Sequence, residues 1–189
     1  MEDPFPAFHK AYPPGAPREA YDPLRHDAFA ARVPAALVAE WRTMGFGPYG
    51  VGLLWTVAPD RPVVDHSDWA GLDGTGIDVL RSAFADVCLW QGGRFVWLNI
   101  HTGTVTAFSA RAGVMFDAGL IEPDFRKSVL LERLFKVASK RFGKLGREEC
   151  FGFAPFPSPW DTFKEEDLTK APMREYVEAA AHVVREARK

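Results

Sequence analysis

The sequence contains little cysteine and no long hydrophobic run, and each absence excludes a class of protein. Its 189 residues include two cysteines, Cys88 and Cys150, which are too few for the disulfide framework of a small secreted domain or for a zinc site of their own. No apolar run approaches the ~20 residues that span a bilayer. The opening MEDPFPAFHK is acidic and lacks the apolar core of a signal peptide. We therefore expect a soluble, cytoplasmic protein that contacts no membrane.

A strong net charge and a nucleotide-binding motif are also missing. The formal net charge is −2, which gives no electrostatic support for general nucleic-acid binding. The glycines of GLDGTG, residues 71–76, follow a polar loop rather than a strand and precede no lysine, so they do not predict a phosphate-binding loop. We expect neither direct nucleic-acid binding nor a nucleotide cofactor.

The sequence has an ordinary globular composition and a proline-rich beginning. Apolar residues make up 47% and charged residues 25% of the chain. Seven of the 15 prolines lie in the first 34 residues, where fixed φ angles and missing donors prevent long helices and central strands. We expect Phe5, Phe8 and Tyr12 to hold this segment on the body as an ordered arm. The alternative is a disordered tail.

Periodic apolar residues predict three longer helices. The first begins near Pro34 and ends at Gly45, and the second ends at Gly143 or Gly146. The third follows Pro172 to the end of the chain. Their expected inward faces are, in chain order, Val33, Leu37, Trp41 and Met44, then Leu131, Leu134, Phe135, Ala138 and Phe142, and finally Met173, Tyr176, Val177, Ala180 and Val184.

The middle of the chain predicts an antiparallel meander. The apolar runs 83–90 and 94–100 are separated by Gln91-Gly92-Gly93, a tight hairpin turn, and TVTAF at 104–108 is a third strand. Residues 94–100 are apolar on both faces, so we expect a packed layer on each side. Residues 49–58 and 149–156 are expected to add one strand each.

These elements predict an α+β fold in which an antiparallel β-meander packs with helices. Residues 60–80, which we call the acidic connector, contain five aspartates opposed by Arg61 alone. We place the junction of two closely associated units there, at residues 1–75 and 76–189.

None of the potentially reactive residues forms a catalytic constellation. Cys88 and Cys150 lie in apolar strands, where a buried thiol is favoured over a nucleophile. His101 lies in the turn of NIHTG, and His66 lies in DHSD, which imitates a loose metal site. We predict a protein that is not an enzyme and uses no cofactor or metal. A hydrolase or metal enzyme based on His66 or His101 is the alternative.

Several motifs carry a resemblance to a known family. LVAEWRTMGFGPYGVGLLWTVAPD, residues 37–60, resembles the GAD-like domain, with its Gly-Phe-Gly turn and Tyr-Gly-x-Gly strand. AFADVCLWQGGRFVWLNIHTGTV and GKLGREECFGFAPF resemble the two halves of the C-terminal immunity-type domain usually fused to it. The resemblance covers most of residues 20–157, and it assigns 1–75 to the GAD-like unit with its arm and 76–189 to the immunity-type domain.

The resemblance implies an immunity protein of type VI secretion systems. Such a protein binds a cognate toxin encoded nearby, a DNase in the best-studied group, and inhibits it without catalysis. It also implies a distant likeness to the SUKH class, so a ligand-sensing or scaffolding module without a toxin is the alternative function. The chain has FPSPWDTF where relatives have an aliphatic, double-glycine stretch, and this departure leaves the toxin's identity open.

Two acidic segments are candidates for the toxin interface, because a nuclease must present a basic surface to its substrate. The first contains a possible tryptophan anchor, and the second includes part of the 158–163 loop. Their residues are Asp60, Asp65, Asp68, Trp69, Asp73 and Asp78, and Glu148, Glu149, Trp160 and Asp161. Ordinary solvated loops are the alternative interpretation. Residues 126–147, with eight basic residues against Glu132, are either a solvated face or a contact for an acidic part of the toxin.

Overall fold

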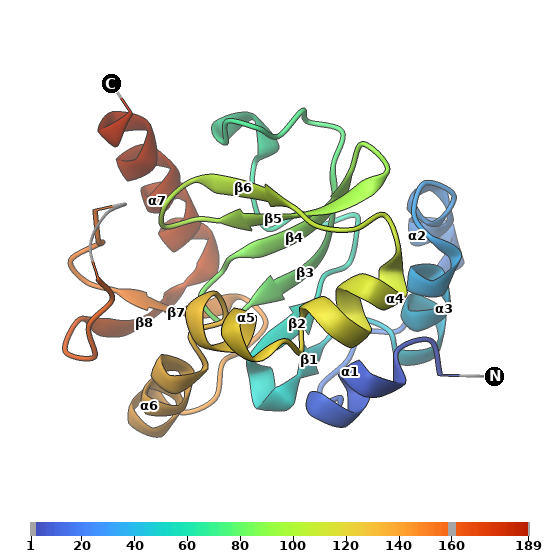
Figure 1. Ribbon diagram of the computed structural model, residues 1–189, viewed down its shortest axis with the longest axis horizontal. Coiled ribbons are helices and arrows are strands. Elements are labelled where there is room, and N and C mark those ends of the chain that lie inside the picture. The colour runs from blue at the N-terminus through green and yellow to red at the C-terminus, as the bar shows by residue number, and fades with distance from the viewer. Residues whose placement is uncertain (1–2, 159–161, 189) are drawn as a thin grey trace.

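A computed structural model describes residues 3–158 and 162–188 and shows an α+β fold (Figure 1). Six antiparallel strands form one sheet in which each strand pairs with the next in sequence, as expected for a meander. Two further strands form a separate antiparallel pair. The strands of the large sheet are β1 (Pro48–Tyr49), β2 (Leu54–Thr56), β3 (Ile77–Ser82), β4 (Val87–Gln91), β5 (Arg94–Asn99) and β6 (Thr104–Ala107), and those of the pair are β7 (Glu149–Phe153) and β8 (Leu168–Pro172).

The helices surround this sheet, with α7 at the left of Figure 1 beside β7 and β8, and α2 and α3 at the right. The α-helices are α1 (Pro6–Ala11), α2 (Pro23–Ala30), α3 (Ala35–Met44), α4 (Ala112–Val114), α5 (Pro123–Ser128), α6 (Glu132–Phe142) and α7 (Met173–Ala187). Short 3-10 turns η1 (Gly50–Gly52) and η2 (His66–Asp68) and the π-helical turn η3 (Met115–Gly119) complete the fold. All three predicted helices are present as α3, α6 and α7.

Glycines end two of these helices and turn the central hairpin. Gly45 after α3 and Gly143 after α6 have φ values of 66° and 78°, a region where a Cβ atom is disfavoured. Gly92 and Gly93, at 58° and 75°, connect β4 to β5. Two successive positive φ values match the twist of an antiparallel hairpin, so the predicted turn is confirmed.

Three sequence-based element boundaries were wrong. Residues 49–58 form the β1–η1–β2 hairpin rather than one strand, because Gly50 and Gly52 turn the chain at positive φ. Residues 83–86 are a turn, and the strand begins at Val87. The acidic connector ends in an unpredicted strand, β3, all of whose residues are buried. β8 was also not predicted.

Hydrophobic cores cover both faces of β5, as predicted. Phe95 and Trp97 belong to a cluster that also contains residues of the arm, α3 and α6. Val96 and Leu98 belong to a second cluster, formed with the inward face of α7 and with Trp69 of the acidic connector. Alternate side chains of a strand point to opposite faces, so the doubly apolar sequence required both layers.

The proline-rich arm is ordered, as predicted. Phe5 and Phe8 are fully buried and Tyr12 is 2% exposed. The ring of Phe5 stacks on that of Phe116 with centroids 4.2 Å apart, and the Tyr12 hydroxyl donates to the carbonyl of Leu120 at 2.9 Å. Aromatic side chains therefore fix the arm where prolines limit regular hydrogen bonding.

The large sheet continues across the proposed junction of two units. β2 pairs with β3, with Trp55 opposite Arg81, so residues on both sides of position 75 share one sheet. The boundary between 1–75 and 76–189 stays a prediction. No helix among the described residues combines the length and apolar character needed to cross a membrane.

Candidate functional site

An open groove of about 870 Å³ lies between the acidic connector and the first half of α7. Asp65 and Asp68 line it from the connector, Glu148 from the residue before β7, and Glu178 from α7. Arg174 is the one arginine or lysine among the described residues of this lining. The fold thus brings the two acidic segments of the sequence into one groove, and it adds Glu178, which the sequence did not suggest.

The carboxylates of the groove differ in how they are held. Asp68 accepts from Arg185 at 2.6 Å, and Glu178 accepts from Arg174 at 3.0 Å. Asp65 caps η2. Hydrogen bonds from the side chain of Ser67 and from the backbone N–H of Ser67 hold the pKa of Asp65 below its ordinary value. Among the described residues, none forms a hydrogen bond or ion pair with the Glu148 carboxylate, which is exposed.

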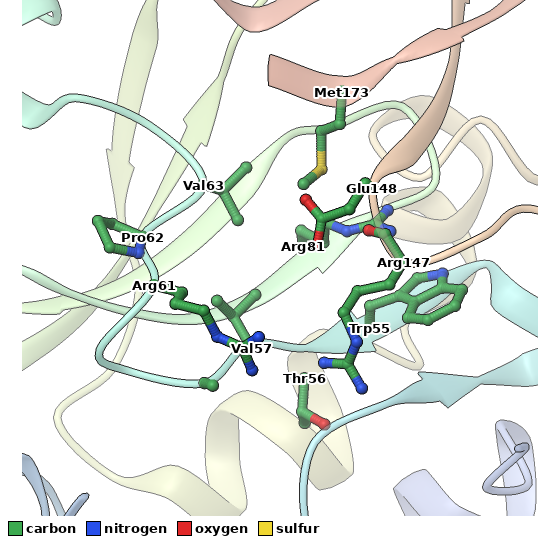
Figure 2. Close-up of a pocket in the computed structure, with 11 residues that line it drawn as sticks. Trp55, Thr56, Val57, Arg61, Pro62, Val63, Arg81, Arg147, Glu148 and Met173 are labelled. Atoms are coloured by element: carbon green, nitrogen blue, oxygen red, sulfur yellow. The ribbon is translucent and has the colours of Figure 1, made fainter. Parts of the chain in front are cut away.

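A smaller pocket of about 120 Å³ adjoins the groove and shares Pro62, Val63, Glu148 and Met173 with it. We call it the arginine pocket, because Arg61, Arg81 and Arg147 line it together with Trp55 (Figure 2). These arginines come from the connector, from β3 and from the turn before β7. Residues far apart in the sequence therefore converge on one small cavity.

Arg81 is the buried member of the arginine pocket, with 2% of its surface exposed. Its Cζ atom lies 4.7 Å from the ring centroid of Trp55. It donates to the carbonyls of Ser82 at 3.2 Å and Arg147 at 2.9 Å. Burial lowers the pKa of Arg81 to about 10, because desolvation disfavours the charged form.

Carboxylates beside the pocket bind Arg61, Arg147 and the neighbouring Arg25. Glu19 of the arm pairs with Arg61, with Arg25 at 3.0 Å and with Arg147 at 3.4 Å. Asp60, a predicted interface residue, binds Arg25 at 2.5 Å. Asp60 therefore helps to join the arm to the connector.

Two predicted interface residues are buried, which corrects their assignment to an exposed patch. Asp78 is 1% and Trp69 is 3% exposed. Asp78 accepts from the backbone N–H of Val63 at 2.6 Å and contacts His66 Nε2 at 2.7 Å, while Trp69 packs in the second core cluster. Both hold the connector onto the sheet, Asp78 through these hydrogen bonds and Trp69 through apolar packing.

The remaining predicted residues lie outside the groove or outside the described residues. Asp73 is exposed and accepts from the backbone and hydroxyl of Thr75. Glu149 pairs with Lys170 at 2.7 Å, and this hydrogen bond lowers the pKa of Glu149. Trp160 and Asp161 lie outside the described residues.

The potentially reactive side chains are enclosed. Both cysteines are buried, and burial raises the pKa of Cys88 and brings that of Cys150 to about 12. His101 is 1% exposed and its Nε2 lies 3.0 Å from the Tyr176 hydroxyl. Its side chain is therefore part of the core. Among the described residues, no group of three or more His, Cys, Asp or Glu side chains is placed to hold a metal ion.

Residues 5–102, just over half of the chain, match the GAD-like domain. The chain belongs to the GAD-like domain family. The matched region of this GAD-like protein runs past the proposed boundary at residue 75 and includes β3, β4 and β5. Membership of this family suggests a protein-interaction role.

A solved structure with a similar fold is that of Atu4351 from Agrobacterium tumefaciens. It is 17% identical in sequence, with a TM-score of 0.71, and the alignment covers 93% of this chain and 87% of the other. At this identity the likeness establishes a shared fold. A comparison with curated proteins gave no match.

One feature of the sequence indicates the arginine pocket and was missed in the sequence-based prediction. Arg81 interrupts the apolar run IDVLRSAF at residues 77–84, and a charged side chain inside a buried strand needs a special environment. Arg147 and Glu178 carried no comparable signal, because isolated charged residues on turns and helices are ordinary surface features.

Proposed function

We propose that this GAD-like protein is an immunity protein that binds and neutralises a cognate type VI secretion toxin. The proposed toxin is a DNase encoded by a neighbouring gene, and binding covers its active or substrate-binding surface. The protein acts in the cytoplasm and catalyses no reaction. The resemblance of residues 37–60, 83–105 and 143–156 to immunity proteins supports this proposal.

The acidic groove is the observation that carries the proposal. A DNase presents basic side chains to the phosphates of its substrate, and the groove offers Asp65, Asp68, Glu148 and Glu178 from three separate elements. Complementary charge raises association rates above the ~10⁵–10⁶ M⁻¹ s⁻¹ of neutral partners. Fast association matters here, because a toxin that is active before it is bound damages its own producer.

The unpaired carboxylate of Glu148 makes it the main contact expected in the groove. Asp68 and Glu178 must exchange Arg185 and Arg174 for a cation of the toxin. Among the described residues, Glu148 has no ion pair to break, although its carboxylate attracts the buried Arg81. We therefore expect Glu148 to contribute more to binding than either paired acid.

The buried thiols and the hydrogen-bonded histidines support inhibition without catalysis. A nucleophilic cysteine needs a lowered pKa and access to substrate, and Cys88 and Cys150 have buried side chains and raised pKa values. His66 and His101 are hydrogen-bonded to Asp78 and Tyr176. An inhibitor requires none of these groups to react.

The experiment is co-purification with the product of the neighbouring gene, followed by a DNase assay with and without this chain. We expect a stable complex and loss of DNase activity at equimolar inhibitor. Binding without inhibition would favour the scaffolding alternative, and no binding in either assay would contradict the proposal.

Charge-reversal variants test the groove itself. Glu148→Lys, and separately the double change of Asp65 and Asp68 to lysine, are expected to lower the association rate by roughly tenfold or more. Asp124→Lys, at an exposed position of α5, is the control and should leave the rate within about twofold. Unchanged kinetics in folded groove variants would remove the groove from the interface.

A further inference from the structure

Arg81 is a buried cation that forms no ion pair among the described residues, and the nearby carboxylate of Glu148 attracts it without a direct contact. Its hydrogen bonds go to three neutral carbonyls, those of Ser82, Gly146 and Arg147. No carboxylate among the described residues forms an ion pair with it. Buried charges are normally paired, because desolvation without a counter-ion is costly.

The more exposed arginines nearby show the opposite arrangement. Arg25, Arg61 and Arg147 each pair with Glu19, and Arg25 also pairs with Asp60. With Arg81 and the pocket-lining Glu148, the cluster has four guanidinium groups against three carboxylates. One positive charge is therefore in excess, and the buried guanidinium is the one with no carboxylate of the described residues in direct contact.

The cavity beside Arg81 has the size of one small group. A volume of about 120 Å³ exceeds the ~10–15 Å³ that one water requires. It is well below the ~300–1,000 Å³ of sites for cofactors and drug-sized ligands. The guanidinium of arginine forms paired, charge-assisted hydrogen bonds with the oxygens of carboxylates and phosphates.

We propose that the arginine pocket is a binding site for a single oxyanion group, a carboxylate or a phosphate. Arg81, which is 2% exposed, supplies the buried charge of this site, and Arg147 and Arg61 supply further charge from its lining (Figure 2). The group comes either from a free small anion or from an acidic side chain of a bound protein. This inference does not depend on the immunity function, because it rests on the pocket's own charge.

Glu148 makes the proposal sharply testable. It lines both the groove and the arginine pocket, so its negative charge should oppose an incoming anion. Glu148→Gln is therefore expected to strengthen oxyanion binding, although Glu148→Lys is expected to slow a basic toxin. The two sites respond in opposite directions to loss of the same charge.

The experiment is a titration of the full chain labelled with ¹⁵N-arginine, in which the NMR signals of the arginine side chains report binding. The probes are inorganic phosphate and N-acetylaspartate amide, which carries one side-chain carboxylate, at constant ionic strength adjusted with chloride. We expect saturable shifts at millimolar concentrations. Tighter binding of phosphate identifies a free anion as the source, and tighter binding of the amide identifies an acidic side chain.

Variants separate a built site from general attraction. Arg147→Gln should weaken binding roughly tenfold, and Glu148→Gln should tighten it. Arg174→Gln, which removes an 89% exposed side chain of the neighbouring groove, is the matched control and should have little effect. Arg81→Met would remove the buried charge itself. The other variants alter exposed or half-exposed side chains, so they still test the proposal if Arg81→Met does not fold. The proposal would be overturned if the probes caused no saturable shift beyond the effect of chloride alone. It would also be overturned if Arg147→Gln bound the probes as tightly as the unaltered chain.

Discussion

Nε2 of His66 lies 2.7 Å from Oδ1 of Asp78, and this contact ties the acidic connector to β3. The other oxygen of Asp78 accepts from the backbone N–H of Val63 at 2.6 Å. Two side chains that the sequence suggested as a metal ligand and an exposed acid therefore bind each other inside the fold. Their interaction fixes one wall of the groove, because Val63 and His66 both line it.

The His66–Asp78 pair predicts a pH-dependent stability. The hydrogen bond to Asp78 raises the pKa of His66 above its ordinary value of 6.5. A raised pKa in the folded state means that the stabilisation is complete below pH 6.5 and is lost as the pH rises through the folded value. Urea unfolding should show the protein losing stability above that range, and His66→Gln should flatten this dependence. A variant with the same pH profile as the unaltered chain would contradict the assignment.

The aromatic residues of the arm should be essential for stability. Phe5→Ala removes a fully buried ring stacked on Phe116, and we expect a loss of about 3–5 kcal/mol in the free energy of unfolding. Leu24→Ala is the control, because Leu24 is 98% exposed and its loss should cost less than about 0.5 kcal/mol. Chemical denaturation of both variants measures the difference. Equal stabilities would mean that the arm does not contribute to the core.

Gly152 of β7 should tolerate no larger residue. A Cβ atom there would overlap the ring of Tyr176, whose hydroxyl accepts from the backbone N–H of Phe153 at 2.9 Å. Gly152→Ala is therefore expected to cost about 1–3 kcal/mol or more. In Gly113→Ala the new Cβ meets no atom within 4 Å. Because alanine loses less backbone entropy than glycine inside a helix, this change should raise the free energy of unfolding by up to about 1 kcal/mol. Thermal unfolding of the two variants distinguishes steric overlap from a general effect of alanine.

The two thiols should be unreactive in the native protein. Burial raises the pKa values of Cys88 and Cys150, so little thiolate exists near neutral pH and reagents have no access to it. Ellman's reagent should label fewer than about one tenth of the thiols in native protein during the time in which it labels both in urea. Rapid labelling of either cysteine in the folded state would reopen the question of thiol chemistry.

Local patterns predicted the parts of the fold in which neighbouring residues decide the conformation. Gly92 and Gly93 specified the hairpin because few other residues adopt two successive positive φ values. Met173, Tyr176 and Val184 specified the inner face of α7 by their spacing. The alternating apolar residues of β5 likewise required a layer on both of its faces.

The same patterns failed where a charged residue is stabilised by a distant partner. Residues 77–80 of β3 were taken as part of the acidic connector because of Asp78, yet Asp78 and the following Arg81 are both buried. Asp78 is compensated by His66 and Val63. Arg81 is held by Trp55 and by carbonyls around residue 147. Local hydropathy patterns cannot predict these contacts, because the partners are distant in the sequence.

For this protein, the sequence alone determined the α+β class, the meander, the three long helices and the ordered arm. Each depends on periodicity, glycine φ angles or aromatic content within a short segment. The tertiary structure decided which acidic residues share a groove, which are buried and where an unpaired guanidinium meets a cavity. Those outcomes depend on Coulombic and hydrogen-bond energies between residues more than one hundred positions apart, such as Asp68 and Arg185. Such energies become defined only when the chain has packed.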